Sequence, residues 1–105
     1  MLGAVSDLAF QALSDPHRRT ILRLVRTDPR SVSELADHFE ISQQAVSQHL
    51  QVLKRAGLVA VRADGQRRLY RVRTDGLESV RQFLSEFWPA ALEDLKRTVE
   101  SDERA

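Results

Sequence analysis

The stretch ISQQAVSQHLQVLKRAGL, from Ile41 to Leu58, carries the signs of a helix with two different faces. Ser42 is a favourable N-cap residue, and Gly57 stands where a helix commonly ends in the left-handed conformation. Apolar residues recur between them with the spacing of one helical face, at Ala45, Val46, Leu50 and Leu53. The stretch therefore predicts a helix over about residues 42–56.

The opposite face of this expected helix carries glutamine and serine, where a solvated helix more often carries pairs of glutamate and lysine. These side chains donate and accept hydrogen bonds, which suits a helix lying against base edges in the major groove of DNA. The DNA-binding residues predicted on this helix are Ser42, Gln43, Gln44, Ala45, Ser47, Gln48, His49, Gln51, Lys54 and Arg55. Within this set, His49 either contacts DNA or packs beside Leu50. Lys54 and Arg55 are phosphate contacts or plain surface charges.

The charge of the chain is unevenly distributed. Residues 42–73 contain seven basic residues and one acidic residue, a net charge of +6, whereas the whole chain carries +1. Residues 1–41 carry five basic against six acidic residues, and residues 74–105 carry four against eight. A basic segment between acidic ends predicts a phosphate backbone as partner. The alternative is a solvated face on which like charges gather by chance.

Three shorter helices are predicted before this stretch, over about 4–14, 16–27 and 33–39, from the helical spacing of their apolar residues. Asp15-Pro16 suits the start of the second helix, because aspartate caps a helix and proline fits its first position. Two short helices joined by a tight turn, the second with an exposed polar face, form the helix-turn-helix pattern.

A basic β-hairpin is predicted after these helices. Asp64-Gly65 is a strong two-residue hairpin signal, and the residues beside it predict strands over 59–63 and 66–72. In this position the hairpin is the wing of a winged helix, whose arginines can reach phosphates or the minor groove. The wing residues predicted to contact DNA are Arg67, Arg68 and Tyr70. The two arginines lie on opposite faces, so only one points at DNA, and Tyr70 either packs or contacts phosphate.

The segment from Asp75 onward predicts a long helix with a wide apolar stripe. Pro89 lacks the N–H that a helix needs, so a kink or break is expected near residues 86–89. The stripe is wider than a small domain requires and is predicted to face a second subunit; the alternative is a pocket for an unknown inducer. The residues predicted at the dimer interface are Val5, Leu8, Phe83, Leu84, Phe87, Trp88, Leu92 and Leu95.

Length and composition predict one domain over residues 1–99 and a flexible tail over residues 100–105. The chain has no cysteine, which removes disulfides and thiolate metal sites. It shows neither a long apolar run nor a basic leader, so a cytoplasmic protein without a membrane span is expected. No nucleophile elbow or glycine-rich phosphate loop is present, so neither an enzyme nor a cofactor is expected.

Three segments resemble the ArsR/SmtB family of small dimeric winged-helix repressors, over essentially the whole chain. LSDPHRRTIL (13–22) is similar to the second-helix signature of the family, SVSELADHFEISQQAVSQHLQVLKRAGLV (31–59) to its helix-turn-helix, and RADGQRRLYRV (62–72) to its wing. The resemblance implies a mainly α fold in the order α-α-α-α-β-β-α. It also implies a transcriptional repressor that dimerises through its first and last helices and binds a palindromic operator.

Many members of this family sense metals through cysteines before the recognition helix, or through Asp, His and Glu on the last helix. Here the segment before the recognition helix has no cysteine, and the last helix has no histidine. The three histidines, His17, His38 and His49, lie on three different expected helices. The ending FLSEFWPAALEDLKR resembles a metal-independent, autorepressor-like subgroup. We therefore expect no metal site and no response to metals. The alternative function is a protein–protein interaction module without specific DNA binding, which would leave the surface of residues 42–73 free of DNA.

Overall fold

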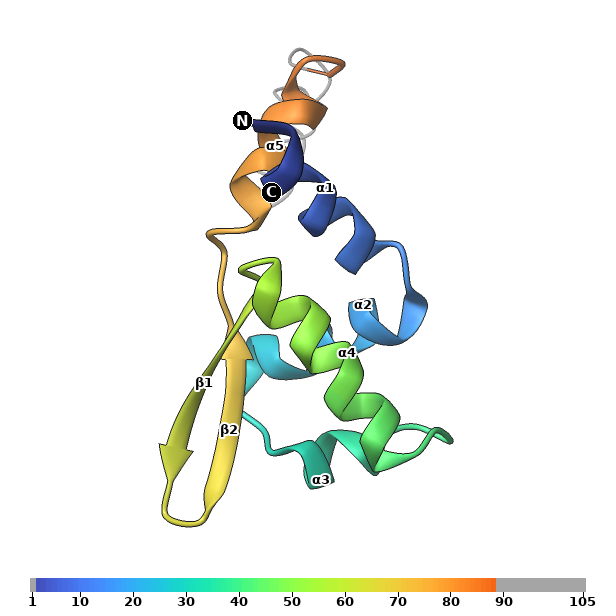
Figure 1. The fold of residues 1–105 in the computed structure, drawn as a ribbon, viewed down its shortest axis with the longest axis vertical. Coiled ribbons are helices and arrows are strands. Elements are labelled where there is room, and N and C mark those ends of the chain that lie inside the picture. Colours follow the sequence, from blue (N-terminus) through green and yellow to red (C-terminus); the bar gives the residue numbers. More distant parts are fainter. Residues whose placement is uncertain (1, 89–105) are drawn as a thin grey trace, which may run out of the picture.

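The structure, a computed structural model, describes residues 2–88, with side chains from Asp7 onward. Within this range it is a winged helix-turn-helix with the expected order of elements (Figure 1). The elements are α1 (Leu2–Leu13), α2 (Pro16–Thr27), α3 (Val32–Ala36), α4 (Gln43–Arg55), β1 (Val59–Asp64), β2 (Arg67–Val72) and α5 (Leu77–Ser85). Val5, Leu92 and Leu95, three of the predicted interface residues, and the tail lie outside the described side chains.

The junction of α1 and α2 is held by local hydrogen bonds. Asp15 caps α2, because its Oδ1 accepts from the backbone N–H groups of His17 and Arg18 at 2.8 and 3.2 Å. The Arg18 guanidinium donates to the carbonyls of Gln11 and Ala12, and that of Arg19 donates to the carbonyl of Leu13. These arginines therefore neutralise the open carbonyls at the end of α1, where cations are favoured.

Helix α3 is shorter than expected. It begins with a capping box, in which the Ser31 side chain accepts from the backbone N–H of Glu34 and the Glu34 side chain accepts from the backbone N–H of Ser31. It ends at Ala36 instead of residue 39, because the N–H of His38 and Phe39 bond three residues back, to Leu35 and Ala36. This tighter turn ends the α-helix but keeps Phe39 packed against the core.

The core lies between α2, α3, α4 and the base of the hairpin. Its largest fully buried side chains are Ile21, Val25, Leu35, Val46, Leu50, Leu53, Leu58 and Val59. Burial of one such side chain stabilises the fold by roughly 1.5–3 kcal/mol. Three of these residues, Val46, Leu50 and Leu53, come from α4, so its apolar face is fixed inward and its polar face is turned away from the core.

The two strands pair antiparallel, from Val59 opposite Val72 to Asp64 opposite Arg67. Gly65 in the turn has φ +63°, the left-handed conformation that the Asp-Gly signal predicts. The backbone of Tyr70 also pairs with Arg30, so a one-residue bridge joins the wing to the segment before α3. The wing is thereby attached to the helix-turn-helix at its base.

Helix α5 leaves the body of the fold beside α1 (Figure 1). It begins at Leu77, and the backbone N–H of Gly76 donates to the carbonyl of Gly57, at the end of α4. It ends at Ser85, followed by a turn over 86–87, in agreement with the break expected ahead of Pro89. Within the described part of the chain, no helix is long and apolar enough to cross a membrane.

Candidate nucleic-acid interface

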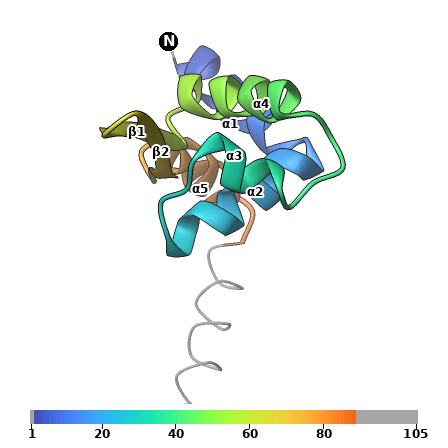
Figure 2. The same ribbon diagram turned by 90° about the horizontal axis from the view of Figure 1, so that it is seen from below.

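The polar face of α4 is uncovered along its length. In Figure 1 this helix crosses the front of the molecule, and in Figure 2 it lies along one edge, outside α2 and α3. The exposed residues on and before it are Ser42, Gln43, Gln44, Gln48, Gln51, Lys54 and Arg55, whereas Ala45, Ser47 and His49 are half-buried. Ser42 caps the helix, because its Oγ accepts from the N–H of Ala45 at 3.0 Å. The amide side chains therefore stand on a rigid helix that is capped at its N-terminus.

The N-terminal part of α4 and the wing lie on either side of a recess of about 260 Å³. It is lined by Ser31, Val32, Ser33, Gln43, Arg67, Arg68 and Tyr70. Gln43 donates to Ser33 Oγ at 2.9 Å, which places one predicted DNA-binding side chain against α3. The recess joins hydroxyl, amide and guanidinium groups, which are the groups that contact a phosphate backbone.

The two arginines of the wing differ in their partners. Arg67 lies 3.4 Å from Asp64 and 3.8 Å from Glu34. The side chains of Arg67 and Asp64 are more than half exposed, and that of Glu34 is slightly less than half exposed. Arg68 is exposed and forms no ion pair within residues 7–88. Its charge is therefore the more available of the two for a phosphate. Tyr70 is 6% exposed and packs with the core, which is the packing alternative for this residue.

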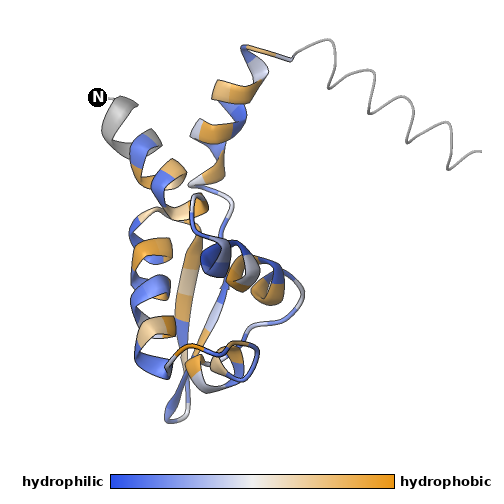
Figure 3. Ribbon diagram, turned by 90° about the vertical axis from the view of Figure 1, so that its right-hand side faces the viewer, coloured by the Kyte–Doolittle hydropathy of each residue, from blue (hydrophilic) through white to orange (hydrophobic). Residues whose placement is uncertain are grey.

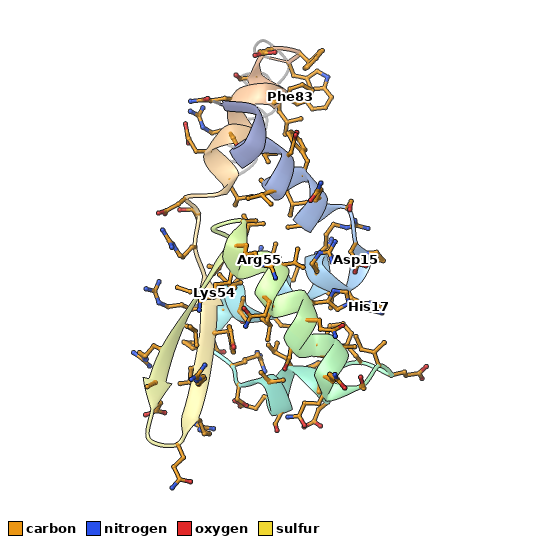
Figure 4. All side chains as sticks on the ribbon, in the orientation of Figure 1. Asp15, His17, Lys54, Arg55 and Phe83 are labelled. Atoms are coloured by element: carbon orange, nitrogen blue, oxygen red, sulfur yellow. The ribbon has the colours of Figure 1, made fainter. Side chains whose placement is uncertain are left out.

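His49 faces the α1–α2 junction. Its Nδ1 lies 3.2 Å from Arg18 Nη1, and its ring centroid lies 5.5 Å from that of His17. Burial lowers the pKa of His49, although Asp15 raises it in part, so this environment favours the neutral imidazole. Figure 4 shows Asp15 and His17 together on this side, away from Lys54 and Arg55 at the C-terminal end of α4. His49 therefore contacts residues of α2, and a contact between His49 and DNA stays a prediction.

A second surface is formed by aromatic side chains of α1 and α5. The described members are Leu8, Phe10, Phe83, Phe87 and Trp88. Phe83 contacts Phe10 edge to face at 5.3 Å and Phe87 at 5.0 Å, yet Phe83, Phe87 and Trp88 are 45, 62 and 51% exposed. Figure 3 shows hydrophobic bands along α5, which projects from the body. Phe10 was not among the predicted interface residues, although a large apolar side chain on the first helix could have indicated it. Leu84, which was predicted at the interface, is half-buried.

Comparison with known proteins agrees with this architecture. Residues 13–62 match a family described as helix-turn-helix domain. An HTH-type transcriptional regulator of Mycobacterium tuberculosis, Rv2034, is 43% identical over 96 residues, which are 91% of this chain and 90% of that protein. The transcriptional repressor SdpR of Bacillus subtilis is 38% identical over 66% of this chain and 77% of its own length. The structure of an ArsR-like transcriptional regulator from Rhodococcus sp. RHA1 has a TM-score of 0.74 at 32% identity and covers 93% of each chain.

Proposed function

Because the chain belongs to the ArsR/SmtB family of helix-turn-helix transcriptional regulators, which bind DNA and are not enzymes, we propose that it is a repressor that binds a palindromic operator as a homodimer. In this proposal α4 lies in the major groove and the wing lies on the backbone or in the minor groove. The protein then acts in the cytoplasm, where the operator is.

The observation that carries the proposal is the uncovered amide face of α4. Gln44, Gln48 and Gln51 are exposed on one rigid helix, and glutamine pairs with the N6 and N7 groups of adenine. We assign base contacts to the N-terminal half of the helix and phosphate contacts to Lys54, Arg55 and Arg68. Tyr70 and His49 support the interface from inside instead of touching DNA.

The aromatic surface of α1 and α5 supports a homodimer. Large aromatic side chains that stay half exposed on two adjacent helices are typical of protein interfaces. A twofold interface brings identical patches together, so Phe83 and Phe87 each count twice in the dimer. Two copies of α4 are then presented about 34 Å apart, one turn of DNA, and this spacing favours a palindromic site.

We propose repression because the Bacillus subtilis relative, SdpR, is a transcriptional repressor. The two kinds of metal site that the family resemblance implies are not supported here. The chain contains no cysteine, and residues 75–105 contain no histidine. We therefore propose that DNA binding is independent of metals at these two positions.

The first expected result is specific, salt-dependent binding to the DNA upstream of the protein's own gene. In a gel-shift or fluorescence-anisotropy titration, affinity should exceed that for random DNA by about 10³-fold or more, and should fall steeply as salt rises because phosphate contacts release counterions. Arg68→Ala should weaken binding to all sequences and reduce the salt slope by about one. Gln48→Ala should cost about 1–3 kcal/mol on the operator and relax the preference for one base pair.

Arg23→Ala is the matched control for these variants, because it removes an exposed arginine from α2, outside both α4 and the wing. It should leave operator affinity within about twofold, since a distant surface charge contributes little beyond a Debye length. Equal affinity of the wild-type chain for operator and random DNA would contradict specific repression. Binding unchanged by both Arg68→Ala and Gln48→Ala would favour the protein–protein interaction module instead.

A further inference from the structure

The α1–α2 junction brings together two imidazoles and a carboxylate. Asp15, His17 and His49 each offer one ligand atom, and these atoms all lie within 4.8 Å of one another. All three side chains are half-buried, and they come from the start of α2 and the middle of α4. Within the described residues this is the one such group of three. His17 and His49 do lie on different helices, but the packing of α2 on α4 places their rings side by side.

We propose that Asp15, His17 and His49 form a binding site for a first-row divalent transition-metal ion such as Zn²⁺. Two imidazoles and one carboxylate, with a water in the fourth position, are a common tetrahedral set for zinc. Ligand atoms around zinc lie roughly 3.3 Å apart, so the three groups must close by about 1.5 Å or less from their present separation. Side-chain rotation supplies a movement of that size.

The carboxylate is available to an ion without loss of the helix cap. Asp15 Oδ1 accepts the two N–H groups at the start of α2, whereas Oδ2 accepts no hydrogen bond from the described residues. The Nδ1 of His17 already lies 3.8 Å from Oδ1. An ion bound through Oδ2 would leave Oδ1 to keep both hydrogen bonds of the helix cap, and these bonds would hold the carboxylate in a fixed orientation.

Arg18 competes with the ion for His49. A guanidinium only donates, so its contact at 3.2 Å requires His49 Nδ1 to be an acceptor, with the proton on Nε2. An ion on Nδ1 takes that lone pair. An ion on Nε2 displaces the proton to Nδ1, which then no longer accepts. In both cases ion binding and the Arg18–His49 hydrogen bond exclude each other.

Because ion binding breaks the Arg18–His49 hydrogen bond, it also affects how the end of α1 is held against α4. Arg18 also donates to the carbonyls of Gln11 and Ala12, so it links the end of α1 to His49 on α4. A bound ion removes the Arg18–His49 hydrogen bond, and coordination by Asp15, His17 and His49 then joins the start of α2 to α4 in its place. The binding step itself does not depend on the proposed DNA function and is measured on the free protein.

The test is a Zn²⁺ titration of the full chain, prepared without an added histidine tag, in competition with a chromophoric chelator. One Zn²⁺ should bind per chain. Asp15→Asn, which still caps α2, His17→Gln and His49→Gln should each weaken binding by about tenfold or more. Arg18→Gln should strengthen it by about fivefold, because a competing cation is removed.

His38→Gln is the matched control, because His38 is the third histidine of the chain and is exposed outside this group. It should leave Zn²⁺ affinity unchanged. Circular dichroism of each variant checks its fold. The imidazole NMR signals of the wild-type chain give a second measurement that needs no substitution. The signals of His17 and His49 should shift with Zn²⁺, and those of His38 should not. Wild-type binding no tighter than that of a His17→Gln/His49→Gln double variant, or equal shifts at all three histidines, overturns the proposal.

Discussion

Gly76→Ala should destabilise the protein by about 3 kcal/mol, a large part of the total stability of a domain of this size. A Cβ at Gly76 would lie 2.1 Å from the carbonyl oxygen of Ala56 and 3.1 Å from the carbonyl carbons of Ala56 and Gly57. These are backbone atoms at the end of α4, which cannot turn aside as a flexible side chain can. The α5 segment must therefore move away from α4, and the hydrogen bond from Gly76 N–H to the carbonyl of Gly57 is strained or lost.

Gly65→Ala is the contrasting variant, because Gly65 has a left-handed backbone in open space, whereas Gly76 has an ordinary backbone in a crowded place. Gly65 has φ +63°, and a Cβ there would meet nothing within 4 Å. Alanine at this position should cost about 1 kcal/mol, from the left-handed backbone alone. The measurement is the midpoint of urea unfolding for both variants. A smaller loss for Gly76→Ala than for Gly65→Ala would show that α5 is free to shift at this joint.

The difference between these glycines marks a limit of what the sequence predicts. Gly57 follows an apolar helix period and Gly65 follows an aspartate, so their positive φ values could be expected from local signals. Gly76 has an ordinary negative φ. Glycine is required at position 76 because the backbone there touches the end of α4. This contact forms only when the chain returns to α4 after the wing, so no local sequence pattern predicts it.

The helices show the same division between local and tertiary causes. Both bounds of α2 agree with local signals: Asp15-Pro16 is a start signal for a helix, and Asp28-Pro29 is a turn signal that ends it. The apolar period predicted that α3 would continue to Phe39, whereas the backbone tightens after Ala36. Phe39 still packs against the core, so the periodicity identified the buried face correctly and misjudged only the backbone that presents it.

The candidate sites divide in a similar way. The exposed face of α4 followed from its period, since Val46, Leu50 and Leu53 could be assigned inward from spacing alone. The group of Asp15, His17 and His49 could not be predicted, because its members meet only when α2 packs on α4. Two side chains on different helices are far apart in the sequence, but they can still be neighbours in the fold.

A Phe83→Glu/Phe87→Glu double variant should convert the proposed dimer into a monomer and abolish tight operator binding. Each phenylalanine contributes about 1.5–3 kcal/mol when buried, and a twofold interface loses four of them and gains four buried carboxylates. The dimer dissociation constant should therefore rise by about 10³-fold or more. Sedimentation velocity measures the association state, and anisotropy on an operator of two half-sites measures the affinity.

The fold of the double variant should be retained, because the two rings are 45 and 62% exposed in the single chain and the core lies between α2, α3, α4 and the wing. Gln82→Glu is the matched control, since it adds one negative charge to an exposed position of the same helix without touching the aromatic surface. It should remain dimeric and bind the operator within about threefold, as expected for an exposed charge. A double variant that sediments as a dimer at the wild-type concentration would place the subunit contact elsewhere. A double variant that is monomeric yet keeps full operator affinity would show that one copy of α4 and its wing suffice for binding.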